Sequence, residues 1–421
     1  YFKKSESIEG LDTEYRNTDG PLKLSRTENG NILSKIYLEA AAQAGYEINN
    51  DMNGYKQEGF GLMDTTIFDG KRQSTSVTYL HPIKQRQNLT LITNIQVSKI
   101  IIENSSAIGV EIKNKNKLEK IFIEKEVLLS AGAINSPQIL MLSGVGPEEE
   151  LKNHGINVIS ALNGVGENLQ DHLETYVQYE CTKPVTLYSS FNPINMALIG
   201  LQWFLFKKGI AAHSNLEIGG FIRTNEMVDY PNMQYHFFPS LVIDHGRQNP
   251  SYHAFQAHVG PMRPTSRGFV KLKSSNPIDS PRIQFNYMQT EHDLNEMREG
   301  IKIARNIFHQ KAFDHYRGKE ISPGENINSD DGLNNFIRSK GDTAYHPSCT
   351  CKMGNDDMSV VDQNLKVYGV EKLRVVDASI MPNIVSGNLN ATTVMIAEKA
   401  SDLIQNKITA EKVNIEFYKA S

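Results

Sequence analysis

The segment KEVLLSAGAINSPQILMLSGVG, residues 125–146, constrains the fold more than any other part of this chain. It opens with an apolar run typical of a buried strand, passes through small residues, and continues with the apolar spacing of a helix. Asn135 or Ser136 can cap that helix, Pro137 can stand in its first turn, and Gly144 can end it. A buried strand, a small-residue turn and a capped helix form half of a nucleotide-binding βαβ unit.

The C-terminal part of the chain has the same texture. KLRVVDASIMP predicts a buried strand from Leu373 to Val376 that ends in Asp377. The following SGNLNATTVMIAEKASDLI predicts a polar loop and then a long helix from about Ala391. An acidic residue at a strand end and a helix that begins after a polar loop are both typical of nucleotide sites. We therefore expect this segment to return to the domain that contains the first strand and helix.

The remaining sequence predicts further helices and antiparallel strands. Residues 31–45 have the spacing of an amphipathic helix with a terminal glycine, and the region from Asn88 predicts strands joined by hairpins. Within residues 173–338, short strands separated by Pro, Gly, Ser and Asn favour an antiparallel sheet. Residues 293–308 predict a helix with one apolar face. The fold class is therefore α/β, α+β overall, and the predicted parts are residues 1–160, 161–345 and 346–421.

Composition excludes several classes of protein. The chain has 421 residues, 39% hydrophobic and 22% charged, as expected for a soluble globular protein of two or three domains. Its net charge of -4 and the absence of a long basic run argue against nucleic acid as a partner. No apolar stretch approaches the roughly 20 residues of a membrane span. The three cysteines, Cys181, Cys349 and Cys351, are too few for a disulfide framework, and a Cys-x-Cys pair alone does not complete a zinc site.

One histidine stands in an unusual context, AYHPSCTCKMG at residues 344–354. Pro347 fixes its own φ and biases His346 toward extended backbone, which suits a histidine that must point in one direction. The same pair suits an ordinary structural turn. Both interpretations stay open at this level.

Five ordered segments resemble the glucose–methanol–choline (GMC) family of flavoprotein oxidoreductases. They are SAGAINSPQILMLSGVGP, GVGENLQDH, PTSRGFVKLKSSNPIDSPRIQFNYM, YHPSCTCKMG and VVDQNLKVYGVEKLRVVDASIMPNIVSGNLNATTVMIAEKASDLI. The resemblance covers essentially the whole chain, and its texture is most similar to insect glucose-dehydrogenase-like members.

The resemblance implies an FAD/NAD(P)-binding-type domain beside an antiparallel substrate domain. It also implies FAD-dependent oxidation of an alcohol or sugar, with electrons passed to a quinone-type acceptor. His346 matches the histidine that takes the hydroxyl proton, a task suited to a group whose pKa is near neutral. Asn388 matches the residue that holds the substrate oxygen. The alternative is that Asn388 only caps the last helix, a task that Asn390 could also perform.

The resemblance further implies a set of FAD contacts, each of which could instead be ordinary core or loop. They are Val97, Ser130, Ala131, Gly132, Asp377, Ala378, Asn390 and Thr392.

The chain departs from the family in one respect. The family opens with a strand, G-x-G-x-x-G and a helix that hold the FAD pyrophosphate, and this sequence shows no such segment. We therefore expect an incomplete FAD-binding domain that binds FAD weakly or not at all by itself. Two alternatives follow: a non-catalytic remnant or interaction protein of the same fold, or a lyase that keeps FAD without redox turnover.

Two smaller expectations concern location and thiols. The sequons at Asn88 and Asn104 and the family likeness favour an extracellular protein, although such triplets also arise by chance. Family members often carry glycine where Cys349 stands, so the turn there requires a small side chain, and we expect free thiols at Cys349 and Cys351.

Overall fold

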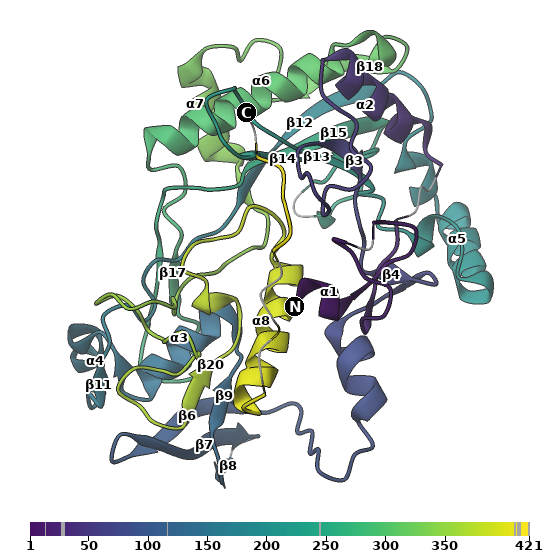
Figure 1. Ribbon diagram of the computed structural model, residues 1–421. Helices are drawn as coiled ribbons and strands as arrows, with labels where there is room; N and C mark the ends of the chain where they lie inside the picture. The colour runs from purple at the N-terminus through teal and green to yellow at the C-terminus, as the bar shows by residue number, and fades with distance from the viewer. Residues whose placement is uncertain are drawn as a thin grey trace.

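The computed structural model describes residues 1–12, 14–26, 30–115, 117–243, 246–407, 410 and 414–419. Figure 1 shows a large sheet with its helices in one lobe and a set of smaller sheets in the other, where helix α8 (Leu389–Ile404) lies beside them. None of the helices in the described ranges combines the length and the apolar character that crossing a bilayer requires.

The first lobe is built on a seven-stranded antiparallel sheet, as the middle of the sequence predicted. Its strand order is β18-β12-β15-β14-β13-β3, and β19 also pairs with β12. The strands are β3 (Gly59–Leu62), β12 (Leu173–Cys181), β13 (Ile218–Ile222), β14 (Met233–Phe238), β15 (Ala254–Pro261), β18 (Arg317–Ser322) and β19 (Asp342–Thr343). Since β3 comes from the first 62 residues, the N-terminal part of the chain also contributes to this sheet. The division at residues 160 and 345 therefore stays a prediction.

Helices pack one face of this sheet into an aromatic core. They are α2 (Ile32–Gln43), α6 (Glu291–Phe308) and α7 (Asp330–Lys340). Tyr37 of α2 stacks on Phe237 of β14 with ring centroids 4.6 Å apart, and Phe255 and Phe308 complete the cluster. The predicted apolar face of α6 is confirmed, because Leu294, Met297, Ile301, Ala304, Ile307 and Phe308 are all buried.

The opposite face of the same sheet is polar. Successive side chains of a strand point to opposite faces, so the residues between the core positions form a second surface. On β12, β14 and β15 these residues are Glu174, Tyr176, Gln178, Gln234, His236, Gln256 and His258. This polar face forms one side of the candidate site, because Gln234 contacts Asn388 there.

The second lobe contains the predicted hairpin strands and the predicted strand-turn-helix unit. Strands β6 (Gln96–Glu103), β7 (Ser106–Asn114) and β8 (Lys117–Phe122) form an antiparallel meander. Strand β9 (Val127–Leu129) pairs in parallel with β20 (Leu373–Val375), and β9 leads into α3 (Gly132–Leu142). Strand β20 of the C-terminal segment therefore lies beside β9 in this lobe.

The predicted cap of α3 was wrong. The helix begins at Gly132, no side chain caps it from its own N-cap residue, and Pro137 stands inside it. Asp377, 245 residues away, accepts a hydrogen bond from Gly132 N at 2.9 Å. Pro137 cannot donate to the carbonyl of Ala133, and the hydroxyl of Thr350 donates to that carbonyl instead, at 2.6 Å. Partners from the C-terminal segment therefore join the local Ser136 hydroxyl in satisfying the backbone groups at the start of α3.

Three further predictions differ in detail. Helix α8 begins at Leu389, two residues before the predicted Ala391. Strands β16 (Phe269–Lys271) and β17 (Arg282–Gln284) pair with each other outside the large sheet. Helix α5 (Pro193–Phe206) lies where no helix was predicted, and its apolar side chains are mostly exposed.

The remaining α-helices and β-strands are short. They are α1 (Phe2–Ser5), α4 (Glu148–Asn153), β1 (Glu6–Ser7), β2 (Leu22–Lys23), β4 (Ile67–Phe68), β5 (Lys71–Arg72), β10 (Val145–Gly146) and β11 (Ser160–Ala161).

Candidate active site

His346 and Asn388 lie side by side, although 42 residues separate them in the sequence. His346 Nε2 is 3.3 Å from Asn388 Nδ2. Asn388 occupies the N-cap position of α8, but its side chain makes no capping hydrogen bond. Its Oδ1 instead accepts a hydrogen bond from Gln234 of β14 at 3.0 Å. The amide of Asn388 therefore contacts Gln234 of the polar face and His346. The interpretation of Asn388 as a simple helix cap is wrong.

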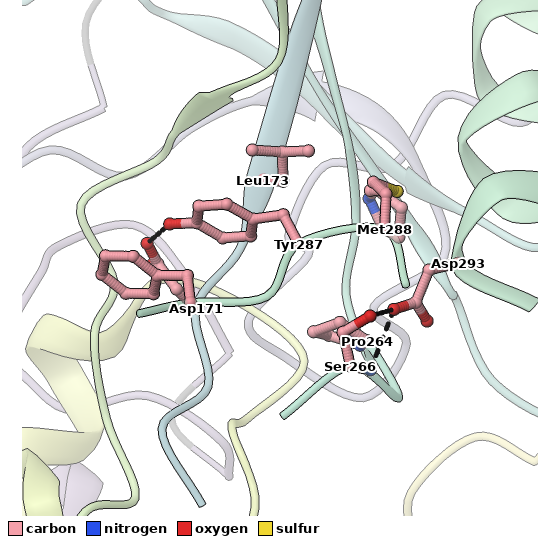
Figure 2. A pocket seen from close by; sticks show the side chains of 9 residues that line it. Asp171, Leu173, Pro264, Ser266, Tyr287, Met288 and Asp293 are labelled. Atoms are coloured by element: carbon pink, nitrogen blue, oxygen red, sulfur yellow. Dashed lines mark hydrogen bonds between the residues drawn. The ribbon is translucent and has the colours of Figure 1, made fainter. Parts of the chain in front are cut away.

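A buried carboxylate holds the backbone of the His346 loop. Asp171 Oδ1 accepts a hydrogen bond from His346 N at 2.8 Å, and Oδ2 accepts one from the Thr343 hydroxyl at 2.6 Å. The Tyr287 hydroxyl also donates to Asp171 (Figure 2). Burial raises the pKa of Asp171, and the hydrogen bonds from Thr343 and Tyr287 act in the opposite direction. Asp171 thus joins the segment before β12 to the loop before His346.

A second histidine, which the sequence interpretation did not single out, contacts the first. His172 Nδ1 is 3.0 Å from His346 Nδ1, and the two rings meet edge to face with centroids 5.1 Å apart. His172 follows Asp171 directly, at the end of GVGENLQDH. That segment was part of the family resemblance, so the polar Asp-His pair at its end was the signal that could have found His172.

The carboxylate of Glu174, on the polar face, acts electrostatically on His346. Glu174 accepts hydrogen bonds from His258 Nδ1 at 2.9 Å and from the Tyr176 hydroxyl at 3.1 Å. Burial acts to raise the pKa of Glu174, but His258 and these hydrogen bonds outweigh it, so the net pKa is lowered and the group stays ionised. Burial lowers the pKa of His346, while the charge of Glu174 acts to raise it. His346 is therefore a neutral imidazole at pH 7 with an anion nearby.

The residues predicted to contact FAD fall into three places. Ser130, Ala131 and Gly132 form the turn after β9, beside Asp377 and Ala378 at the end of the paired strand β20. Asn390 and Thr392 lie in the first turn of α8. Val97 lies on β6 and packs partly against the core of the second lobe.

The geometry of this region fits a dinucleotide. The carboxyl ends of two parallel strands meet at Ser130 and Asp377, where nucleotides bind in such sheets. Gly132 has φ +81, and a side chain there would meet no atom within 4 Å, so the backbone is open to a close ligand. The first turn of α8 lacks a side-chain cap, which leaves its N–H groups for an anionic or oxygen-rich partner. A cavity of about 310 Å³ lies between the β9 and β20 strands and the later turns of α8, with Ser130 and Val376 in its wall.

Comparison with known proteins settles the family. Two family profiles described as GMC oxidoreductase match the chain, one over residues 1–174 and the other over residues 264–397. The chain belongs to the GMC oxidoreductase family. The predicted resemblance is thus confirmed, and the chain is an FAD-dependent oxidoreductase that acts on CH–OH donors.

Its curated relatives include choline dehydrogenases. The mitochondrial choline dehydrogenase of Mus musculus is 50% identical over 421 residues, which cover 100% of this chain and 71% of that protein. The oxygen-dependent choline dehydrogenase of Acinetobacter baumannii (strain AYE) is 49% identical, covering 100% of this chain and 77% of that one. The predicted likeness to insect glucose dehydrogenases stays a prediction that these choline-named relatives do not support.

Solved structures of the family share the fold. Pyridoxine 4-oxidase from Mesorbium loti superposes with a TM-score of 0.86 at 26% identity, covering 97% of this chain and 76% of that one. Formate oxidase from Aspergillus oryzae superposes with a TM-score of 0.90 at 23% identity, covering 96% and 77%. The predicted combination of an FAD-binding fold and an antiparallel sheet is confirmed.

The cysteines beside the site are structural in character. Cys349 and Cys351 are free and fully buried, as expected. Cys349 has φ +77, the left-handed conformation that favours glycine, which agrees with the predicted need for a small residue. Burial raises the pKa of the Cys349 thiol to about 12, so it is not a thiolate at neutral pH.

Proposed function

We propose that this protein oxidises choline, or a closely similar alcohol that carries a quaternary ammonium group, to the aldehyde. The observation that carries the proposal is the largely shielded carboxylate of Glu174 on the polar face that the His346–Asn388 pair meets through Gln234. The relatives named for choline, identical at half of the aligned positions, support this choice of substrate.

The alcohol loses two groups in this reaction, a proton from its oxygen and a hydride from the adjacent carbon. His346 Nε2 is the proposed acceptor of the proton, because a neutral imidazole with a lowered pKa is unprotonated at working pH. Asn388 Nδ2 lies 3.3 Å from that nitrogen and can donate a hydrogen bond to the substrate oxygen as negative charge develops on it. Asn388 cannot itself act as a base, so the two roles are separate.

Glu174 is the proposed recognition group for the cationic end of the substrate. It remains ionised, it is largely shielded from water, and the ring of Tyr176 lies beside His258 with centroids 4.6 Å apart. A carboxylate and aromatic rings in a poorly hydrated wall suit a quaternary ammonium ion, which cannot donate a hydrogen bond. A neutral sugar would bring no positive charge to Glu174 beyond its contacts with His258 and Tyr176.

FAD supplies the hydride acceptor that the reaction requires. The residues proposed to hold it are Ser130, Ala131 and Gly132 in the turn after β9, Asp377 and Ala378 after β20, Asn390 and Thr392 in α8, and Val97 in β6. The chain's uncapped α8 would place its positive helix end toward the cofactor. The family resemblance favours a quinone-type molecule as the final electron acceptor.

The test is anaerobic bleaching of the flavin absorbance in FAD-loaded protein. Choline is expected to bleach it, whereas its neutral isostere 3,3-dimethylbutan-1-ol and glucose should do so at least about tenfold more slowly at equal concentration. Faster bleaching by glucose than by choline would remove the ammonium group from the proposal. A parallel assay with oxygen and with a soluble quinone then identifies the acceptor.

A further inference from the structure

His172 presents both ring nitrogens to fixed partners in the interior. Its Nε2 is 3.0 Å from the carbonyl oxygen of Met262, and its Nδ1 is 3.0 Å from His346 Nδ1. Its own carbonyl accepts a hydrogen bond from Ala344 N at 2.9 Å, which ties its backbone to the loop before His346. The side chain is 1% exposed, so water does not compete for either nitrogen.

The carbonyl oxygen of Met262 fixes the direction of the hydrogen bonds that link it to His172 and then to His346. A backbone carbonyl only accepts hydrogen bonds, so His172 must carry a proton on Nε2 and donate it to Met262. In a neutral imidazole the other nitrogen is then bare. His172 Nδ1 is therefore an acceptor, and His346 must donate to it from Nδ1.

The reverse arrangement would require a doubly protonated His172. Burial, together with the nearby His346, lowers the pKa of His172 to about 3, so the ring is neutral at physiological pH. With His172 Nδ1 bare, a bare His346 Nδ1 would place two nitrogen lone pairs 3.0 Å apart, and these would repel.

The contacts at the far side of His346 agree with this direction. Gln234 donates to Asn388 Oδ1, which turns the amide nitrogen Nδ2 of Asn388 toward His346 Nε2. An amide nitrogen donates, so His346 Nε2 is the accepting, bare nitrogen. This contact is 3.3 Å long and lies on the exposed side, whereas the contact with His172 is 3.0 Å long and lies deeper.

We propose that His172 sets the tautomer of His346, holding the proton on Nδ1 so that Nε2 keeps its lone pair for the substrate hydroxyl. His172 is a positioning residue that acts through His346. The tautomer follows from the hydrogen-bond geometry around a neutral His172, while its importance for catalysis rests on the proposed function of His346 as the base.

The tautomer can be observed directly by NMR. In the chain with ¹⁵N-labelled histidines, long-range ¹H–¹⁵N correlations show which nitrogen of each ring carries the proton. We expect His346 to be protonated on Nδ1 and His172 on Nε2, with His346 assigned by loss of its signals in His346→Gln. A His346 ring protonated on Nε2 in the unmodified chain would overturn the proposal without the need for any variant.

Three substitutions locate the group that imposes the tautomer. His172→Phe removes the acceptor at similar size, and the Nε2-protonated form of His346 is expected to become the larger population. His172→Asn can present an oxygen at the position of Nδ1 and is expected to keep the Nδ1-protonated form, as is Asn388→Ala. His253→Phe, a substitution of a histidine that bonds Thr186 away from the site, serves as the matched control. An unchanged tautomer in folded His172→Phe would contradict the proposal.

Kinetics separate this proposal from the proposed function. In FAD-loaded protein, His172→Phe is expected to slow flavin reduction about tenfold or more, and His172→Asn to restore most of that loss. If His346→Ala reduced its flavin at the normal rate, His346 would not be the base, yet the NMR result would still decide whether His172 sets its tautomer.

Discussion

Alternate residues of β12 point to two faces of the large sheet, one apolar and aromatic and the other polar. Val177, Tyr179 and Cys181 pack into the aromatic core under α6, whereas Glu174 and Gln178 join the polar network of the other face. Both faces are largely buried, so the difference between them is one of chemistry and not of exposure. The aromatic face lowers the free energy of the fold, and the polar face supplies the charges and hydrogen bonds of the site. Substitutions on the aromatic face should therefore change the free energy of unfolding, and those at the polar face should mainly change the kinetics.

The largest effect is expected from the aromatic face. Phe255→Ala removes a fully buried ring that contacts Tyr179, Phe237 and Phe308, and should lower the free energy of unfolding by about 3–5 kcal/mol. Phe122→Ala is the control, since that ring is 65% exposed and its loss should cost at most about 0.5 kcal/mol. Urea unfolding measures both, and equal losses would contradict the assignment of the core.

At the site beside the polar face, His346→Ala should lower the rate of the reaction without lowering the stability of the fold. Loss of the base is expected to slow flavin reduction about a hundredfold or more, a barrier increase of about 2.7 kcal/mol, with little change in the urea midpoint. His292→Ala, on the exposed side of α6, is the control and should keep normal kinetics. Stopped-flow absorbance measures the rate, and an unchanged rate would remove His346 from its role.

The polar face should also make stability depend on pH. Burial lowers the pKa of His172 to about 3, so below about pH 6.5 the unfolded chain binds a proton that the folded chain does not. The stability from neutral His172 is therefore complete above about pH 6.5 and is lost as pH falls toward 3, at up to about 1.4 kcal/mol per pH unit. Urea unfolding at pH 7, 6 and 5 should show a shallower decline in His172→Phe than in the unmodified chain. Parallel declines would show that His172 does not stay neutral in the folded state.

The smallest effect should come from Glu174, and it should depend on the substrate. Glu174→Gln keeps the shape but removes the charge, so KM for choline is expected to rise about tenfold while KM for its neutral isostere changes little. Glu180→Gln, an exposed position on the same strand, is the matched control. A similar rise for both substrates would point to a structural role for Glu174 and not to recognition of a cation.

Local patterns predicted those features whose causes are local. The period-2 texture of the middle segment predicted an antiparallel sheet, and the spacing of Leu294, Met297 and Ile301 predicted the buried face of α6. The cap of α3 could not be predicted in the same way, because the group that accepts from Gly132 N is Asp377, 245 residues away, to which Ser136 donates a hydrogen bond. The contacts at the start of α8 are also tertiary, since the side chain of Asn388 at its N-cap position bonds Gln234 and His346 and does not cap the helix.

The residues of the candidate site also fall into two groups, those predicted from the sequence and those identified only from contacts in the structure. His346 and Asn388 were predicted from motifs that resemble a family, but the importance of His172 and Glu174 depends on which groups face them in space. A sequence pattern assigns residues to a strand or a face; it does not state which face meets which loop.

By itself, the sequence determined the family, the antiparallel character of the middle segment and the buried face of α6, and it predicted His346 and Asn388 as site residues, since periodicity and ordered motifs are properties of the chain as written. Only the tertiary structure decided which side chains share protons and charges there. Hydrogen bonds act over about 3 Å and are directional, so contacts between residues far apart in the chain exist only after folding has brought them together.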